Sequence, residues 1–397
     1  MRILFFTRQL SIGGCQVNAI NLAVALERLG HHVVFAAEGG PLVESLERAG
    51  IAWEPMEYMS RKHPSRDTVR TLARLVDVHA LDLIQAFDPI PILEAYGSQW
   101  LHDRPVYGLI AAQPTPEFRL ARAREVALVN PDTRDRYVEE SGWAPERIRL
   151  ITARLDCRRY RPIVAPRLEG WESDETVPTA TLVSRIDEGK WPTIELWLSA
   201  AAHWATTRSE HALRFAIVGG GPELGRLRER LARLAGTSVV TTGERLDIPE
   251  IMNASAVVLG MASTCQQGMA CGRPVVVLGE QGYSELVSPE SFEFLASQHF
   301  NVHGPSAQEQ PEALCAQLQG LLDDRARAAR LGEFGRARAL ERYDSSIGAR
   351  QLEAVYAELL QKPPSTARRV ELWTDYTFSM MSLYAYRTRR WLGRSAT

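Results

Sequence analysis

The sequence predicts an α/β protein with two doubly wound domains, each built on a parallel sheet, followed by a helical C-terminal tail. Its 397 residues suffice for about two domains. Short apolar runs alternate with helical patterns, as in parallel sheets whose strands are joined by crossover helices. A polar stretch interrupts this alternation, which then restarts. We therefore expect a first domain at 1–163, a linker at 164–178, a second domain at 179–347, and helices with a tail at 348–397.

The first domain opens with the strand ILFFT, the glycine turn SIGG and a helical pattern that Gly30 closes. Ile20 and Val24 lie at helical spacing within that pattern. Further apolar runs predict strands at 32–37, 51–56, 81–88, 104–112, 124–132 and 146–156. Helical patterns between them lie at 41–50 and 68–80.

The second domain follows a stretch rich in proline and acidic residues, PIVAPRLEGWESDETVP. Strands are predicted at 179–187, 214–221, 238–243, 255–260 and 273–279. Helices are predicted at 191–205, 223–236, 306–324 and 325–344, with a short one after Ser263. The segment EQGYSELV, 280–287, is expected to be a loop that leads into another helix start.

Composition narrows the functional classes. The chain is 45% hydrophobic and 24% charged, ordinary values for a soluble protein. The net charge of −2 gives no argument for nucleic acid, and there is no apolar run of about 18 residues. The N-terminal apolar run is too short for a signal peptide, so we expect a cytoplasmic protein. The five cysteines lack zinc-like spacing, so no metal site is predicted.

Loops at the expected carboxyl ends of strands are the candidate binding sites, because helix N-termini there suit phosphate. The loop SIGGCQ contains Gly13 and Gly14, which let backbone approach a ligand closely; a tight turn explains them equally well. The loop SRIDEGKW contains Arg185 and Lys190. These two cations can clamp a diphosphate, and lysine is rare here, since Lys62, Lys190 and Lys362 are the only three among 46 basic residues. The alternative is a pair of solvated surface charges.

Two further loops carry weaker signals. AIVGGGPELG, with Gly219 and Gly220, is similar to a dinucleotide fingerprint, and Glu244 would be its ribose-binding acid. The first βα turn lacks this fingerprint, however, and no hydride-relay residue can be assigned. In STCQQGMACGRPVVV, the residues Ser263, Thr264 and Cys265 place hydroxyl and N–H groups at a helix start that precedes a buried strand.

Together these segments resemble the retaining nucleotide-sugar glycosyltransferases of the GT-B fold, family 4 type, over roughly residues 1–360. SRIDEGK is similar to the family's cationic segment, and IVGGGPE to its IVGxGPE segment. TGERLDIPEIMNASAVVLG and QQGMACGRPVVVLGEQGYSELV are similar to the two motifs that follow. The order of the segments is also that of the family.

This resemblance implies two facing Rossmann-like domains, with the donor nucleotide on the C-terminal one and most of the acceptor on the N-terminal one. Arg185 and Lys190 would neutralise the leaving diphosphate, so neither a metal nor another cofactor is expected. Backbone at Gly243, Glu244 and Arg245 would meet the base. Glu285, on the acid of the last motif, is assigned to donor binding. UDP is the expected nucleotide, with GDP and TDP as alternatives.

The chain also departs from the family pattern. The acid that holds the ribose hydroxyls falls on Gln267, and no acid occurs at 259–262 for its partner. The histidine near the sugar falls in a region that offers Gln113 instead. Asp88, at the tip of the preceding strand, is a candidate sugar or acceptor contact, and a helix-capping aspartate is the alternative.

Three hypotheses follow. The first is a retaining glycosyltransferase, and abundant arginine suggests a bacterial source and natural-product or envelope glycosides. The second is a non-catalytic GT-B paralogue that binds nucleotide or a partner, and the third is a dinucleotide oxidoreductase. The tail at 367–392 is aromatic, rich in methionine and flanked by arginine. It is expected either to pack on the body or to contact a second copy or the inner membrane surface. No nucleic-acid partner is expected.

Overall fold

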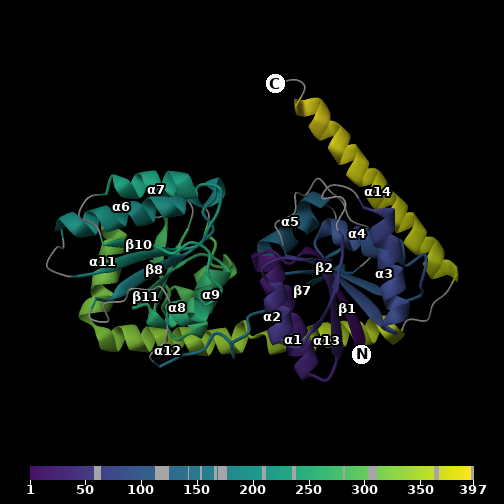
Figure 1. Cartoon of the computed structure of the whole chain (residues 1–397), viewed down its shortest axis with the longest axis horizontal. Coiled ribbons are helices and arrows are strands. Elements are labelled where there is room, and N and C mark those ends of the chain that lie inside the picture. The colour runs from purple at the N-terminus through teal and green to yellow at the C-terminus, as the bar shows by residue number, and fades with distance from the viewer. Residues whose placement is uncertain are drawn as a thin grey trace. The chain divides into compact units, whose positions relative to one another are not determined.

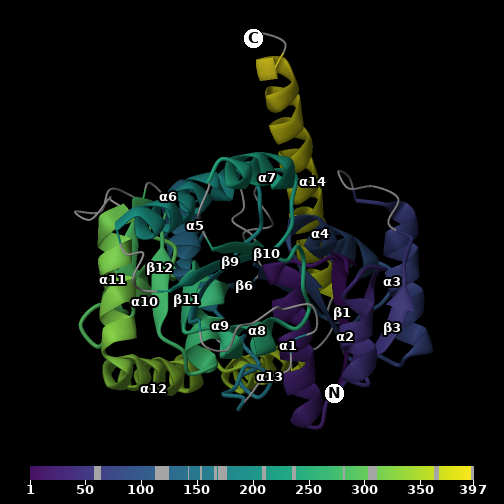
Figure 2. The same ribbon diagram turned by 60° about the vertical axis from the view of Figure 1, so that its left-hand side comes forward.

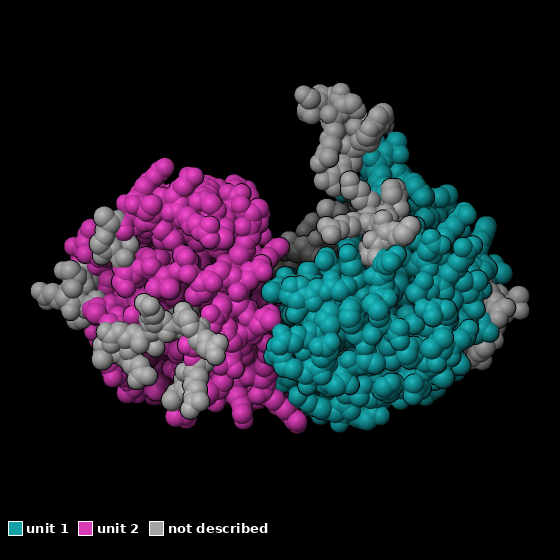
Figure 3. Space-filling view, viewed as in Figure 1, with its two compact units in different colours: residues 1–156, 345–397 teal, residues 157–344 magenta. Residues whose placement is uncertain are grey.

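The computed structural model describes residues 1–57, 64–111, 125–141, 143–152, 154–164, 168, 177–207, 212–234, 238–279, 282–302, 311–361 and 366–394. The chain divides into two compact units (Figure 3). Unit 1 comprises Met1–Asp156 and Ser345–Thr397, and unit 2 comprises Cys157–Asp344. These divisions differ from the expected ones, because the C-terminal helices return to unit 1. Most of the expected linker at 164–178 lies outside the described residues.

Unit 1 is built on one sheet with the strand order β3-β2-β1-β4-β5-β6-β7 (Figure 1). Every neighbouring pair is parallel. The strands are β1 Arg2–Gln9, β2 His32–Glu38, β3 Ala52–Pro55, β4 Leu83–Phe87, β5 Val106–Ile110, β6 Val126–Leu128 and β7 Ile148–Leu150. The predicted doubly wound fold is confirmed for this unit.

The helices of unit 1 cover this sheet. They are α1 Gly14–Arg28, α2 Val43–Arg48, α3 Arg66–Val78, α4 Pro89–Ser98, α5 Pro131–Ser141, the short 3-10 helix η1 Pro145–Arg147, α13 Ser345–Gln361 and α14 Thr366–Arg394. Ser65 caps α3, since its hydroxyl accepts hydrogen bonds from the N–H groups of Asp67 and Thr68. Phe5 of the inner strand β1 packs on Phe35 of β2 and Phe87 of β4, with ring centroids 5.6 and 5.1 Å away.

Unit 2 has a second sheet with the order β10-β9-β8-β11-β12-β13. Its strands are β8 Thr179–Val183, β9 Arg214–Val218, β10 Val239–Thr241, β11 Val257–Gly260, β12 Val275–Leu278 and β13 Ser284–Leu286. Its helices are η2 Glu188–Lys190, α6 Trp191–Thr207, α7 Leu224–Ala232, α8 Ile248–Ala254, α9 Ser263–Ala270, α10 Phe292–Ser297, α11 Pro311–Asp323 and α12 Arg325–Arg342. The buried Trp197 ring lies 6.1 Å from that of Phe215 in its core.

The edge strand β13 departs from the prediction. The segment 280–287 was expected to be a loop before a helix, but Ser284–Leu286 pairs antiparallel with β12. The N–H of Gly279 donates to the carbonyl of Tyr283 at 2.9 Å, and Gly282 has a positive φ of 83°, a conformation that glycine adopts readily. The next helix, α10, begins only at Phe292.

The segment 157–163 is held on unit 2 by buried polar contacts. The guanidinium of Arg336 in α12 donates to the carbonyl oxygens of Tyr160 at 2.7 Å and Cys157 at 3.2 Å. The side-chain oxygen of Asn253 accepts from the N–H of Ile163 at 2.8 Å. The expected boundary at 163 therefore lies seven residues further along than the division at 156.

Helix α13 belongs to unit 1 because a buried hydrogen bond joins it to the sheet. The hydroxyl of Tyr356 donates to the side-chain oxygen of Gln85 on β4 at 2.8 Å, and both side chains are fully buried. The ring of Tyr107 on β5 meets the Tyr356 ring edge-on at 6.3 Å. Within the described part of the chain, no helix is long and apolar enough to cross a membrane.

We predict that Tyr356→Phe lowers the free energy of unfolding by about 1–3 kcal/mol, since the buried oxygen of Gln85 loses this donor. Urea unfolding followed by circular dichroism measures the change. The double variant Gln85→Met/Tyr356→Phe removes both partners and should regain part of the loss. An unchanged midpoint in the single variant would show that this bond does not hold α13.

Candidate functional site

Four loops of unit 2 meet at the carboxyl edge of its sheet. The strands β10, β9, β8 and β11 are consecutive neighbours and run parallel, so the loops that follow them are adjacent. These are the loops in which the sequence analysis placed most of the donor site. The tertiary structure therefore brings together residues that are about 80 positions apart, from Arg185 to Thr264.

The loop after β8 presents two cations. The guanidinium of Arg185 lies 3.2 Å from the carboxylate of Asp187, and the Arg185 side chain is 72% exposed. Asp187 also caps η2, because its other oxygen accepts from the N–H of Lys190 at 3.0 Å. Asp187 thus braces the loop while the arginine stays accessible to solvent or a ligand.

Lys190 connects this loop to the start of α9. Its ammonium lies 2.7 Å from the sulfur of Met261, in the loop between β11 and α9. The hydroxyl of Thr264, in the first turn of α9, donates to the carbonyl of Val183 at the end of β8, at 3.2 Å. A lysine charge is therefore held beside a helix N-terminus, and both features attract an anion.

The glycines after β9 permit a close approach to the β8 loop. A Cβ on Gly219 would lie 1.9 Å from the carbonyl oxygen of Ser184, and one on Gly221 would lie 2.2 Å from that of Ile186. Both glycines have positive φ, 148° and 154°. The three glycines at 219–221 thus allow close backbone packing. They follow β9, the second strand of unit 2, whereas a dinucleotide fingerprint follows the first strand of its domain. This arrangement argues against the oxidoreductase hypothesis.

The loop after β10 joins the same group. The N–H of Gly219 donates to the carbonyl of Gly243 at 2.9 Å, and the exposed side chain of Glu244 lies against Gly220. Arg245 forms a two-point ion pair with Asp247, with nitrogen to oxygen distances of 2.8 and 2.5 Å. This hydrogen bonding lowers the pKa of the Asp247 carboxyl.

The start of α9 differs in detail from the expectation. The Cys265 thiol is fully buried, and burial raises its pKa far above the usual range, so it offers no side chain to a ligand. The N–H groups of Thr264 and Cys265 donate to the carbonyls of Met261 and Ala262, both at 3.1 Å. Ser263 is partly exposed at the first helical position. Because the Thr264 hydroxyl donates to Val183 and the Cys265 thiol is buried, Ser263 is the candidate for contact with a ligand among the three.

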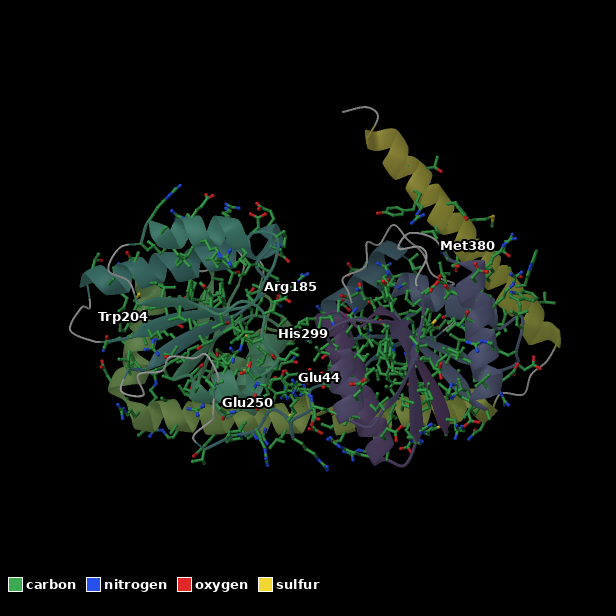
Figure 4. The ribbon with its side chains drawn as sticks, in the orientation of Figure 1. Glu44, Arg185, Trp204, Glu250, His299 and Met380 are labelled. Atoms are coloured by element: carbon green, nitrogen blue, oxygen red, sulfur yellow. The ribbon has the colours of Figure 1, made fainter. Side chains whose placement is uncertain are left out.

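The sequence analysis did not identify His299, which lies beside α9. Ala262, the residue before α9, has a φ of 49°, and its N–H donates to the carbonyl of Phe300 at 2.8 Å. His299 and Phe300 themselves have φ values of 53° and 54°. Figure 4 shows His299 and Arg185 on the same side of unit 2. No glycine marks this left-handed turn, so the sequence carried no signal for it.

The two glutamines of α9 have different environments. Gln266 is buried, and within the described residues its side-chain nitrogen has no hydrogen-bond partner. Gln267 is partly exposed and lies four residues after Ser263, hence on the same face of α9. It is Gln267 that occupies the position of the expected ribose contact.

Glu285 does not belong to the four loops described above. It is on β13 and lines a pocket of about 650 Å³ with residues of α11, α12 and the loop after β13, including Gln317, Arg327 and Phe334. Burial raises the pKa of its carboxyl. The described residues that line this pocket include none from the β8 loop or the start of α9.

Unit 1 has its own group of residues at the carboxyl edge of its sheet. Asp88 follows β4 with a φ of 68°, and one of its oxygens accepts from the N–H of Ala111, after β5, at 3.2 Å. The Cys15 thiol donates to Asp88, and burial and this carboxylate raise the thiol pKa. Burial lowers the pKa of the neighbouring Arg154 to about 10, which leaves it charged at neutral pH. Asp88 makes no side-chain cap of α4, so it is not the capping aspartate of the alternative interpretation.

Gly13 and Gly14 lie at the start of α1, in the same unit as Asp88. Gly13 has an extended backbone that any residue can adopt, and a Cβ on Gly14 would meet no atom within 4 Å. A Cβ on Gly13 would lie 2.7 Å from the side-chain oxygen of Gln16, a flexible group that would have to move, whereas the space beside Gly14 is open. Gln113 lies outside the described residues.

Among the described residues, no group of three or more His, Cys, Asp or Glu side chains is arranged to hold a metal ion. What the unit 2 loops offer is positive charge and a helix N-terminus. These features are suited to a phosphate or diphosphate.

Comparisons with known proteins agree with this chemistry. Residues 177–324, within unit 2, match the family described as Glycosyl transferases group 1. No curated protein sequence matches the chain. A glycosyltransferase from Rickettsia africae has the same fold, with a TM-score of 0.70, 16% identity, and coverage of 91% of this chain and 99% of the other.

Two further solved structures share the fold over both units. Anabaena HepE in complex with UDP-glucose matches with a TM-score of 0.66 and 17% identity, over 90% of this chain and 100% of its own. Sucrose-phosphate synthase from Thermosynechococcus elongatus matches with a TM-score of 0.60 and 17% identity, over 90% and 99%. The GT-B fold predicted from the sequence is confirmed.

We predict that Gly219→Ala weakens both folding and diphosphate binding, because its Cβ would overlap a backbone oxygen and force the β8 loop to move. The matched control is Gly225→Ala in α7, where a Cβ meets no atom within 4 Å. That change should be neutral or stabilise by up to about 1 kcal/mol. Thermal unfolding with and without UDP measures both effects. Equal behaviour of the two variants would contradict the packing role of Gly219.

Proposed function

We propose that this chain, a glycosyltransferase of the GT-B fold, transfers a sugar from a nucleoside-diphosphate sugar to an acceptor with retention of configuration. The contact of 2.7 Å between the Lys190 ammonium and Met261 carries the proposal, because it holds a cation at the start of α9. Arg185 adds a second, accessible charge from the same loop. The site is therefore suited to a group with two negative phosphates.

Both cations would act mainly on the leaving group. As the sugar–oxygen bond breaks, negative charge develops on the diphosphate, and preorganised cations stabilise that charge more than the ground state. The start of α9, with Ser263, would contact the phosphate nearest to Lys190. In a retaining transfer the acceptor attacks from the side of the departing diphosphate, whose oxygen then takes the acceptor's proton.

UDP is the nucleotide we propose, with GDP and TDP as alternatives. The support is that HepE, of the same fold, binds UDP-glucose in its structure. The backbone at Gly243 and Glu244 would meet the base, and Gln267 one ribose hydroxyl. An amide accepts at one oxygen, whereas a carboxylate accepts charge-assisted bonds at two, so nucleotide binding should be weaker by about 1–2 kcal/mol than with glutamate.

Asp88 is the residue we propose for the acceptor or the transferred sugar. Its strained backbone and its bonds to Ala111 and Cys15 hold the carboxylate at the end of β4. A carboxylate accepts hydrogen bonds from sugar hydroxyls and repels phosphate. Unit 1 would thus bind the neutral partner of the reaction, and unit 2 the anionic one.

We predict that Arg185→Ala and Lys190→Met each lower kcat by about 10²–10³, as removal of a transition-state donor does. Affinity for UDP, measured by calorimetry, should fall much more than affinity for uridine, because the lost contacts are to phosphate. Thermal stability of Arg185→Ala should not change, since that side chain is 72% exposed.

Two control variants test whether the loss depends on the charges of this loop and not on any exposed charge of the chain. Arg228→Ala removes an exposed arginine of α7 and should leave UDP affinity and turnover unchanged. Asp88→Asn, in unit 1, should lower turnover and leave UDP affinity unchanged. If Arg185→Ala and Lys190→Met bind UDP and turn over like the parent protein, the proposed diphosphate site is wrong.

The second candidate is a non-catalytic GT-B protein that binds nucleotide, and the amide at Gln267 favours it. We predict that Gln267→Glu raises UDP affinity about tenfold through stronger ribose bonds. In a transferase this variant also hydrolyses or transfers sugar from a UDP-sugar, which coupled assays detect. Tighter UDP binding with no turnover of any nucleotide sugar in either protein would support the non-catalytic alternative instead.

A further inference from the structure

Helix α14 has an inner face that is packed on unit 1. Ser379 and Leu383 are buried, and Tyr376 and Met380 pack against the hydrophobic core of the unit. A Cβ on Gly97 of α4 would lie 3.3 Å from the Tyr376 ring, which shows how closely the two helices approach. Figure 4 labels Met380 where α14 meets the unit.

The same helix has a second apolar face whose side chains are exposed. Val370, Trp373, Met381 and Tyr384 are 60%, 54%, 59% and 52% exposed. Their separations of three, eight and three residues place them along one side of the helix, which we call the outer face. Large apolar side chains in such a row are uncommon on a free surface.

The C-terminal part of α14 projects beyond the rest of unit 1 (Figures 1 and 2). A helix is stabilised mostly by packing of one face. Among the side chains of α14 that the structure describes, Leu383 is the last buried one, while the helix continues to Arg394. We therefore ask which molecule the projecting part of α14 could bind.

The charge of the C-terminal end of the chain indicates what kind of surface α14 would bind. From Tyr376 to Thr397 the sequence contains four arginines, at 387, 389, 390 and 394, and no aspartate or glutamate. The whole chain has a net charge of −2, so the remaining residues together carry −6. Arg389 is exposed and Arg387 partly exposed. A basic end on an otherwise acidic chain is attracted to an anionic surface and repels a parallel second copy of itself.

We propose that the outer face of α14 binds the surface of an anionic lipid bilayer. Aromatic and methionine side chains along one side, with arginines beyond them, are the features of helices that lie in the interface plane. Arginines next to the apolar row would contact lipid phosphates, and the row itself would enter the boundary between headgroups and acyl chains. The inference does not depend on the proposed glycosyl transfer.

Flotation of the full chain with vesicles tests this directly. Binding should be strong to phosphatidylcholine vesicles that contain about one third phosphatidylglycerol, weak to pure phosphatidylcholine, and reduced by salt, because surface charge is screened. Trp373→Ser/Met381→Ser should lower vesicle affinity at least tenfold, and Arg387→Gln/Arg389→Gln should remove the preference for anionic lipid. Thermal unfolding verifies that these variants stay folded.

The matched control is Val78→Ser, which removes an apolar side chain, 63% exposed, from α3 of the same unit. It should bind vesicles like the parent chain. Equal binding to neutral and anionic vesicles, or no binding to either, overturns the proposal. So does a dimer in sedimentation equilibrium that Trp373→Ser/Met381→Ser dissociates, because the outer face would then be a contact between copies.

Discussion

The Lys190 side chain crosses from the loop after β8 to the loop before α9, and this contact organises the anion site. This contact depends on how the neighbouring loops are held, by close backbone packing at two glycines and by one side-chain hydrogen bond. Gly219 and Gly221 allow the loop after β9 to pack directly on the carbonyl groups of Ser184 and Ile186, so the two loops constrain each other's position. The hydroxyl of Thr264 ties the first turn of α9 to Val183. A shift in either contact would move the lysine away from the helix N-terminus.

The two units share a backbone feature at the carboxyl edge of the sheet but carry different side chains on it. In unit 1, β4 is the neighbour of the first strand, β1, and in unit 2, β11 is the neighbour of that unit's first strand, β8. Each is followed by a residue with positive φ that precedes a helix, Asp88 in unit 1 and Ala262 in unit 2. The strained turn exposes the helix start in both. A carboxylate at this position would disfavour phosphate, whereas the alanine methyl carries no charge, and the cations of unit 2 come from Arg185 and Lys190 on the neighbouring loop.

The C-terminal segment has two physical roles in unit 1. Helix α13 is part of the fold, because the buried Tyr356 hydroxyl satisfies Gln85 in the middle of the sheet. Helix α14 adds Leu383 to the core and carries an exposed apolar row on another side. The first helix stabilises the domain, and the second presents a surface whose composition suits an interface between water and lipid.

The alternation of apolar runs and helical patterns was sufficient to predict two doubly wound units, because each run must be buried and parallel strands need crossover helices. Motif order was sufficient to indicate the GT-B fold and to single out Arg185 and Lys190 by their position after a strand. Other features had no local signal. The antiparallel β13 depends on a turn at Gly282, and the left-handed turn at His299 lacks any glycine. The buried state of Cys265 depends on packing around α9.

Sequence by itself therefore determined the class of fold, the loops that form the site and the kind of charge they carry, since these follow from residue type and chain order. Only the tertiary structure decided which groups remain accessible. It turned the Thr264 hydroxyl and the Cys265 thiol inward, placed Lys190 beside α9, and assigned Glu285 to another pocket. It also returned the C-terminal helices to unit 1. Such outcomes depend on contacts between residues distant in the chain, which local patterns do not encode.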